Sequence, residues 1–265
     1  MEYSYSYRFM LVCSVLVLCL NTRGARCQLS DDFYDYICPD VYTVVQQHVY
    51  AAMRTEMRMG ASLLRLHFHD CFVNSGGPYY DVLLGRRDGL VANQSGADNG
   101  LPSPFEPIKS IIQKFNDVGL DTTDVVVLSG GHTIGRARCT LFSNRLSTTS
   151  SSADPTLDAT MAANLQSLCA GGDGNETTVL DITSAYVFDN RYYQNLLNQK
   201  GLLSSDQGLF SSDDGIANTK ELVETYSADA HKFFWDFGRS MVKMGNISPL
   251  TGDDGQIRKN CRVVN

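Results

Sequence analysis

Apolar residues recur at helical spacing along most of this chain, and short polar or glycine-rich breaks separate the segments. The longest such stretch, 41–72, has Gly60 as its only internal breaker. Apolar side chains at positions i, i+3 and i+4 share one face of a helix. The pattern therefore predicts a mainly α chain, with further helices over 108–118, 122–128, 157–169, 190–198, 219–226 and 228–244.

Capping and breaking residues set some of these boundaries. Asp121 is placed to cap the helix 122–128, and Gly130 and Gly131 follow its last apolar residue. The segments 82–84 and 178–180 are predicted as short strands. The serine- and glycine-rich segments 147–153 and 170–174 are predicted as surface loops.

The N-terminus carries an apolar run, 9–20, behind Arg8. A membrane span needs about 20 apolar residues, so this run is too short. It fits the hydrophobic region of a secretory signal peptide covering 1–27, which leaves one domain over 28–265. The alternative is a buried N-terminal core helix. No later segment is apolar enough to span a membrane, so no membrane association is expected after signal cleavage.

Charge narrows the range of partners. Residues 1–27 contain Arg8, Arg23, Arg26 and Glu2, so removing them changes the formal net charge from −7 to −9 (19 Lys and Arg against 28 Asp and Glu). An acidic chain of this kind is not expected to bind nucleic acid.

Cysteine usage is unusual for a secreted chain. Three of the eight cysteines lie within 1–27, and five remain, although secreted proteins normally pair their cysteines. The mature region also contains glycosylation sequons at Asn93, Asn175 and Asn246, which agree with secretion.

Three histidines lie in chemically suggestive settings. Arg65 and His69 are one helical turn apart and share a face, and Phe68 lies beside them. His67 faces elsewhere and is expected to be a core histidine. A metal pair of His67 and His69 would need a strand, where positions i and i+2 share a face. His132, at the end of a hydrophobic helix, would more often be structural if taken alone.

The motifs together resemble the class III secretory plant peroxidases. The resemblance covers nearly all of 28–265 and is specific in order and spacing. It rests on the segments 64–74 (LRLHFHDCFVN), 84–88 (LGRRD), 101–105 (LPSPF), 128–135 (LSGGHTIG), 188–193 (FDNRYY), 244–252 (MGNISPLTG) and 255–262 (GQIRKNCR).

The resemblance implies a haem-peroxidase fold with haem b between distal and proximal helices. His132 resembles the axial ligand of the haem iron, and Asp206 resembles the carboxylate that accepts its other ring N–H. His69 resembles the distal base that moves a proton of hydrogen peroxide. Arg65 resembles the cation that stabilises developing charge, with Phe68 beside it. Pro102 matches the position that binds small phenolic donors, which would each give one electron.

The resemblance also implies calcium. Its proximal site corresponds to Thr133, Asp181, Ser184, Val187 and Asp189. Such hard oxygen ligands suit Ca²⁺. The alternative for the two aspartates is that they are exposed helix-capping carboxylates. At the distal calcium site only Asp70 and the Val73 carbonyl are present, too few for an ion that takes six to eight ligands.

The chain departs from the family after Asn74. A block of roughly 65 residues is absent there, including an asparagine that supports the distal histidine. The resemblance pairs Cys139 with Cys169. It leaves Cys38, Cys71 and Cys261 without the partners that the absent block supplies in the family.

Two functions follow as hypotheses. The first is a secreted, monomeric haem peroxidase of the cell wall, apoplast or vacuole. The second is a non-catalytic haem-binding or poorly folding product of a skipped exon or a faulty gene model. The junction after Asn74 and the odd cysteines support the second hypothesis, and the motif set supports the first.

Overall fold

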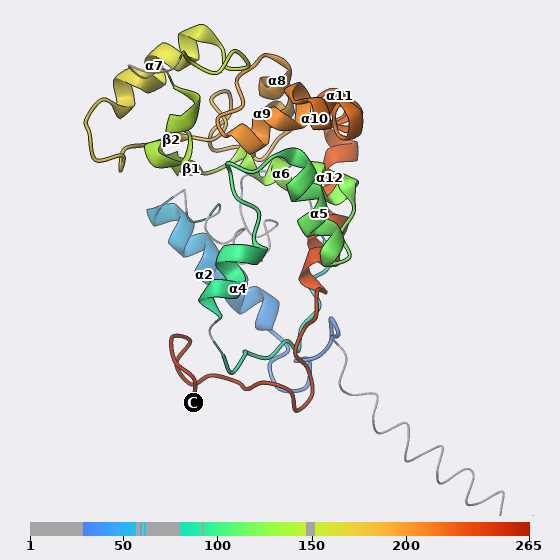
Figure 1. Cartoon of the computed structure of the whole chain (residues 1–265). Helices are drawn as coiled ribbons and strands as arrows, with labels where there is room; N and C mark the ends of the chain where they lie inside the picture. The colour runs from blue at the N-terminus through green and yellow to red at the C-terminus, as the bar shows by residue number, and fades with distance from the viewer. Residues whose placement is uncertain (1–28, 57–58, 60, 62–79, 92, 147–151) are drawn as a thin grey trace, which may run out of the picture. The chain divides into compact units, whose positions relative to one another are not determined.

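Helices dominate the structure, a computed structural model that describes residues 29–56, 59, 61, 80–91, 93–146 and 152–265 (Figure 1). The chain forms two compact units. The larger runs over Asp40–Val82 and Asn93–Ile247, and the smaller over the chain up to Pro39, Leu83–Ala92 and Ser248–Asn265. The prediction of a mainly α fold is confirmed. No helix in the described part of the chain has both the length and the apolar character needed to cross a membrane.

The larger unit is built around α6 (Thr122–Ser129). The Asp121 carboxylate accepts from the backbone N–H groups of Thr123 and Asp124, and Asp124 accepts from the N–H of Asp121, so the helix begins with a complete capping box. Val125, Val126 and Val127 are completely buried, so α6 is a central core helix.

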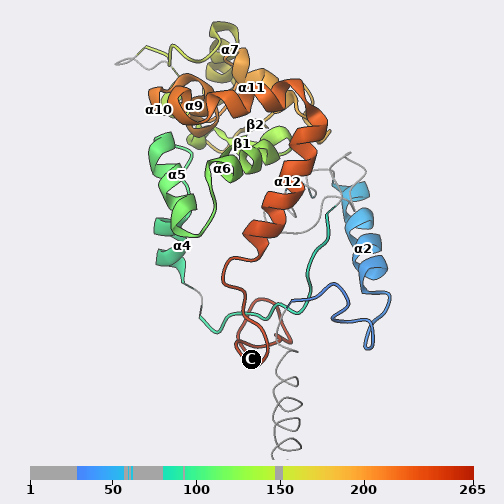
Figure 2. The same cartoon turned by 90° about the vertical axis from the view of Figure 1, so that its right-hand side faces the viewer.

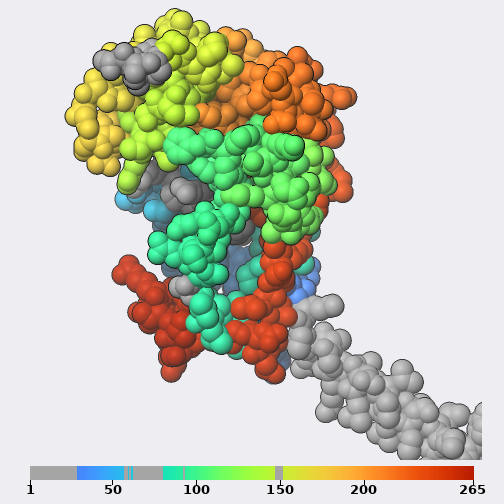
Figure 3. All heavy atoms as spheres, viewed as in Figure 1, coloured from blue at the N-terminus to red at the C-terminus, as the bar shows by residue number. Residues whose placement is uncertain are grey.

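Helices that precede and follow α6 in the sequence pack around it and complete this main core (Figure 2). They are α5 (Ile108–Asp117), α8 (Arg191–Leu197), α9 (Ser204–Ser211), α11 (Lys220–Ala228) and α12 (Ala230–Gly245), and α10 (Asp213–Asn218) packs on α9. In the space-filling view the green atoms of α5 and α6 adjoin the orange atoms of the C-terminal helices (Figure 3).

Aromatic rings fill the centre of this core. Phe188 stacks on Phe233 with ring centroids 5.5 Å apart, and Tyr193 meets Phe233 edge-on at 5.1 Å. Edge-on and stacked pairs of this kind stabilise a core beyond their buried area. The cluster packs against the segment that carries His132, because Tyr193 and Phe233 lie next to Gly130.

A second apolar cluster surrounds α7 (Ala159–Cys169), which Asp158 caps. Ala137 of β1 (Arg136–Arg138) belongs to this cluster. β1 pairs antiparallel with β2 (Thr177–Val179), with Ala137 opposite Thr178. Short 3₁₀ helices, η3 (Gly130–Thr133), η4 (Cys139–Leu141) and η5 (Ser143–Arg145), connect α6 to this region.

The N-terminal helix is shorter than predicted. α2 (Val41–Thr55) ends where Glu56 adopts an extended backbone, so the expectation of a helix continuing through 56 is wrong. Its buried residues, Val49 and Met53, belong to a small separate cluster with Val45 and Met59. The short helix α4 (Gln94–Gly100) was not predicted, because its glycines and polar residues give no apolar period.

The smaller unit is held by backbone pairing between distant segments. Ser30 and Leu84 exchange two backbone hydrogen bonds of 2.8 and 3.0 Å, and Asp88 and Gln256 exchange two of 2.8 and 2.9 Å. The predicted strand at 82–84 is therefore reduced to a single bridge at Leu84. Gly85 has a φ of +102°, and the Phe33 ring occupies the place of a Cβ there, so only glycine fits.

Candidate active site

The position of His132 follows from how α6 ends. After Ser129 the chain tightens into η3, and a Cβ at Gly130 would collide with the Tyr193 hydroxyl and the Phe233 ring. The glycine therefore lets η3 lie directly against the aromatic core. His132 is fixed one residue before the completely buried Thr133.

The His132 ring is held by a carboxylate from another helix. Its Nδ1 lies 2.8 Å from Oδ1 of Asp206, in the first turn of α9, although the two residues are 74 positions apart. The Asp206 side chain is 3% exposed and that of His132 is 40% exposed. Because the carboxylate accepts the Nδ1–H, Nε2 becomes the ring nitrogen suited to a metal.

Asp206 itself is fixed by further donors. The backbone N–H of Leu203 lies 3.3 Å from Oδ2, and the Tyr192 hydroxyl lies 2.9 Å from Oδ1. Burial, followed by the charge of Asp206, raises the pKa of Tyr192 well above its usual range, so the phenol stays protonated and donates. Sequence reasoning did not single out Tyr192. Its place in the FDNRYY motif, beside an apolar helix face, was the available signal.

A buried arginine that the sequence analysis missed holds the start of α9. Arg145 is 1% exposed, and its Nη1 donates to the carbonyls of residues 201–203. Its Nε pairs with Asp154 at 2.8 Å, and its Nη2 donates to Thr156 at 3.2 Å. These bonds fix the segment immediately before Asp206. A sequence shows an arginine but not its burial, so only the fold identifies this role.

Oxygen atoms converge beside His132. The Thr133 hydroxyl lies 3.2 Å from Asp181 Oδ2, 3.4 Å from Asp189 Oδ1 and 3.5 Å from the Val187 carbonyl. The Ser184 hydroxyl lies 3.2 Å from Asp181 Oδ2 and 2.9 Å from Asp189 Oδ1. All five residues predicted for the proximal calcium site are thus brought together.

The composition of this cluster fits a calcium ion. It offers two carboxylates, two hydroxyls and a carbonyl, all hard oxygens. Asp181 is completely buried, and within the part of the chain that the structure describes no lysine or arginine pairs with it. Among the described residues no three His, Cys, Asp or Glu side chains form a metal-binding group, and this cluster contains only two carboxylates.

The remaining predicted site residues include exposed residues, one disulfide, free cysteines and residues that the structure does not describe. Pro102 is exposed between α4 and α5, and Asn93, Asn175 and Asn246 are all exposed. Cys139 and Cys169 form a disulfide, as the resemblance implies, while Cys38 and Cys261 are free thiols. Several predicted features lie outside the described residues: the signal peptide 1–27, Arg65, Phe68, His69, Asp70, Cys71, Val73 and the junction after Asn74.

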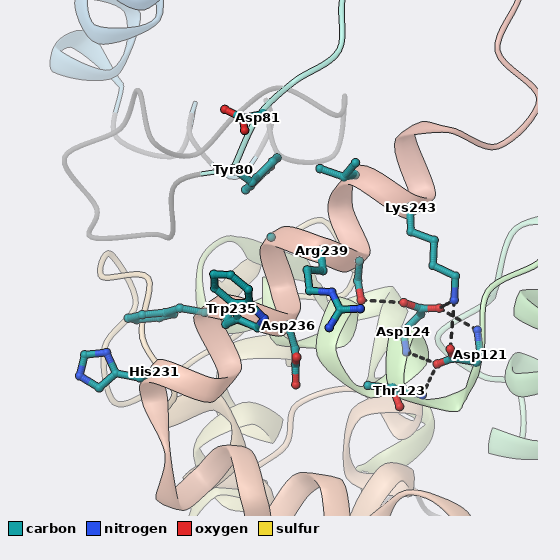
Figure 4. A pocket seen from close by; sticks show the side chains of 14 residues that line it. Tyr80, Asp81, Asp121, Thr123, Asp124, His231, Trp235, Asp236, Arg239 and Lys243 are labelled. Carbon is teal, nitrogen blue, oxygen red and sulfur yellow. Dashed lines mark hydrogen bonds and ion pairs between the residues drawn. The ribbon is translucent and has the colours of Figure 1, made fainter. Parts of the chain in front are cut away.

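An open cavity lies elsewhere in the larger unit, along α12. Figure 4 shows His231, Trp235 and Arg239 following one another along this helix, with Lys243 reaching toward the capping box of α6. None of the described lining residues belongs to the predicted catalytic or calcium sets. This cavity is therefore distinct from the site around His132.

Comparison with known proteins shows which family the chain resembles. A peroxidase family model matches residues 73–229. The chain is 44% identical to Peroxidase N of Armoracia rusticana, over 95% of this chain and 96% of that protein. It is 39% identical to Peroxidase 15 of Ipomoea batatas (96% and 98%) and 38% identical to the lignin-forming anionic peroxidase of Nicotiana tabacum (95% and 98%).

The alignment with Peroxidase N runs over 316 residues, although this chain has 265, so at least 51 aligned positions carry no residue of this chain. The identities nevertheless extend over nearly the whole chain, and the family match covers more than half of it. The chain therefore belongs to the class III plant peroxidase family, whose members are oxidoreductases that reduce hydrogen peroxide with electrons from a donor.

Proposed function

We propose that this chain is a secreted, monomeric haem peroxidase in which His132 is the axial ligand of the haem iron and Asp206 holds its Nδ1 proton. The 2.8 Å contact between His132 Nδ1 and Asp206 Oδ1 carries the proposal. It joins two residues that are distant in sequence, and it leaves Nε2 as the nitrogen that would take a metal. Family membership implies haem and usually calcium.

Different residues are proposed to bind the haem, to act on hydrogen peroxide and to bind the donors. Bound haem supplies the iron at which the peroxide is reduced. His69 moves a proton from one peroxide oxygen to the other, and Arg65 stabilises the charge that develops there. Phe68 belongs to the same proposed set, at i+3 from Arg65 in the sequence. Pro102 contacts the phenolic donors, which approach singly and each give up one electron.

The cluster around Thr133 and Asp181 binds one Ca²⁺ in this proposal. Its two carboxylates share hydroxyl donors. Arg191 pairs with Asp189 at 3.6 Å, whereas among the described residues Asp181 has no cationic partner, so a bound Ca²⁺ would offset the charge of Asp181. The distal remnant of Asp70 and Val73 is too small to hold a second ion. The family matches favour the enzyme over a non-catalytic product. The absence of a block after Asn74 stays a prediction.

The test of the axial ligand is haem binding by single variants. His132→Ala should lose the spectrum of histidine-ligated haem. His231→Ala, which changes an exposed histidine on α12, should retain it. His69→Ala should also bind haem but react slowly with peroxide. A His132→Ala protein with an unchanged haem spectrum would show that another residue ligates the iron.

A further inference from the structure

Two hydrogen-bond donors share one oxygen of Asp206. Oδ1 lies 2.8 Å from Nδ1 of His132 and 2.9 Å from the hydroxyl of Tyr192. The Tyr192 residue is 2% exposed, and so is Asp206. Tyr192 and Asp206 are thus buried together, and the Tyr192 hydroxyl is part of the hydrogen-bond system of Asp206 and His132.

The second donor changes how Asp206 acts on His132. A hydroxyl bound to Oδ1 draws negative charge toward itself from the same oxygen that accepts the imidazole N–H. In a buried, low-dielectric site this competition is strong, because hydrogen bonds to ionised groups are stronger there than in water. The Tyr192 bond should therefore weaken the Nδ1–H···Oδ1 bond and leave the imidazole less anionic.

We propose that Tyr192 is a positioning residue that sets the strength of the Asp206–His132 hydrogen bond, and through it the electron donation of His132 to haem iron. The link from His132 to iron rests on the proposed function. A more anionic imidazole favours the ferric over the ferrous ion. Tyr192 thus holds the reduction potential above the value that the Asp–His pair alone would give.

The neighbouring residue provides a matched control. Tyr193 is also completely buried in α8, but its hydroxyl donates to the carbonyls of Val126 and Val127, at 3.1 and 3.4 Å. Tyr192→Phe and Tyr193→Phe each delete one buried hydroxyl from adjacent positions. Only the first deletes a donor to Asp206.

The experiment measures the ferric/ferrous midpoint potential and the iron–histidine stretching frequency of the parent and both variants with haem b bound. Tyr192→Phe should shift the potential to more negative values and raise the stretching frequency, while Tyr193→Phe should leave both unchanged. Equal values in Tyr192→Phe and the parent, a shift of opposite sign, or the same shift in both variants would overturn the proposal.

A measurement without haem separates this inference from the proposed function. In the haem-free protein, the NMR resonance of the His132 Nδ1–H should move downfield in Tyr192→Phe, because the bond to Asp206 shortens. An unmoved resonance overturns the inference even if His132 ligates iron. Conversely, a downfield shift combined with intact haem binding in His132→Ala would refute the axial-ligand role and leave the Tyr192 effect on Asp206 standing.

A second variant covers the case in which Tyr192→Phe does not fold. Site-specific 3-fluorotyrosine at position 192 retains the hydroxyl and makes it a stronger donor. It should move the Nδ1–H resonance upfield and the potential to more positive values. Shifts in the opposite direction would contradict the proposed competition at Oδ1.

Discussion

The Thr133 hydroxyl lies 3.2 Å from Oδ2 of Asp181, and both residues are completely buried. The residue next to His132 is therefore tied directly to the loop that carries the carboxylates of the proposed calcium site. A calcium ion that stabilises this loop would therefore also restrain the backbone at His132. This connection makes the ion testable through stability as well as through activity.

Calcium should raise the thermal midpoint of the folded protein, and Asp181→Ala should abolish the gain. An ion that binds only the folded state stabilises it by about 2.7 kcal/mol when free calcium is 100 times the Kd. Thermal scans with calcium and with chelator measure the effect. Asp253→Ala, which removes an exposed aspartate from the smaller unit, should keep the gain. Two tightly bound ions per chain in metal analysis would contradict the proposed single site.

Thiol chemistry should distinguish one disulfide from three unpaired cysteines. Cys139 and Cys169 close a 30-residue separation, so replacing both with alanine should cost about 2–4 kcal/mol of unfolding free energy. Peptide mapping after alkylation of the unfolded, unreduced protein should find label on Cys38, Cys71 and Cys261. A uniform bridge between Cys38 and Cys261 would show that the chain has adapted its disulfide pattern.

The pair of Arg145 and Asp154 should make stability depend on pH in the acid range. Burial alone would raise the pKa of Asp154, but hydrogen bonds from Arg145 and Thr156 outweigh it and lower the pKa below 3.8. A carboxyl with a lowered folded-state pKa contributes stability that is present above its unfolded pKa and is lost as pH falls through the folded value.

Denaturant titrations from pH 6 down to about pH 2 measure this contribution. The parent should lose unfolding free energy steeply below about pH 4, and Asp154→Asn should be less stable at pH 6 but show a shallower decline. Asp253→Asn, which changes an exposed aspartate of the smaller unit, serves as control and should decline as steeply as the parent. If the unfolding free energy of Asp154→Asn declines as steeply as that of the parent, the pair of Arg145 and Asp154 does not cause the acid dependence.

The reaction with hydrogen peroxide should be slow for this family. His69, the proposed distal base, would lack the asparagine of the absent block. Such a partner interaction typically contributes about 10–100-fold to the rate. A misoriented His69 would also lose much of the rate enhancement of about 10²–10⁴-fold that general acid–base catalysis supplies. We therefore expect a rate at least about 100-fold below that of a family member that retains the block. Stopped-flow mixing with peroxide measures it, and equal rates would show that the distal site does not need the absent block.

Local patterns predicted much of the helical framework. α5, α6 and α8 begin and end within about two residues of their expected bounds, because apolar spacing and caps act over single turns. The sequence motif also named Asp206 and the five calcium residues through resemblance. It could not predict α9 and α10, whose polar and glycine-containing segments have a weak apolar period.

The sequence by itself determined the family, the mainly α character and the identity of His132 and Asp206 as partners. Only the tertiary structure decided that Tyr192 donates to the same carboxylate oxygen as His132, and that Arg145 is buried against the carbonyls before α9. The strand predicted at 178–180 is present as β2, but its pairing with β1, as in the bond from Arg136 to Thr177, was decided only by the tertiary structure. Helical spacing and capping are local properties of the chain, whereas shared acceptors and buried charges depend on which distant segments pack together.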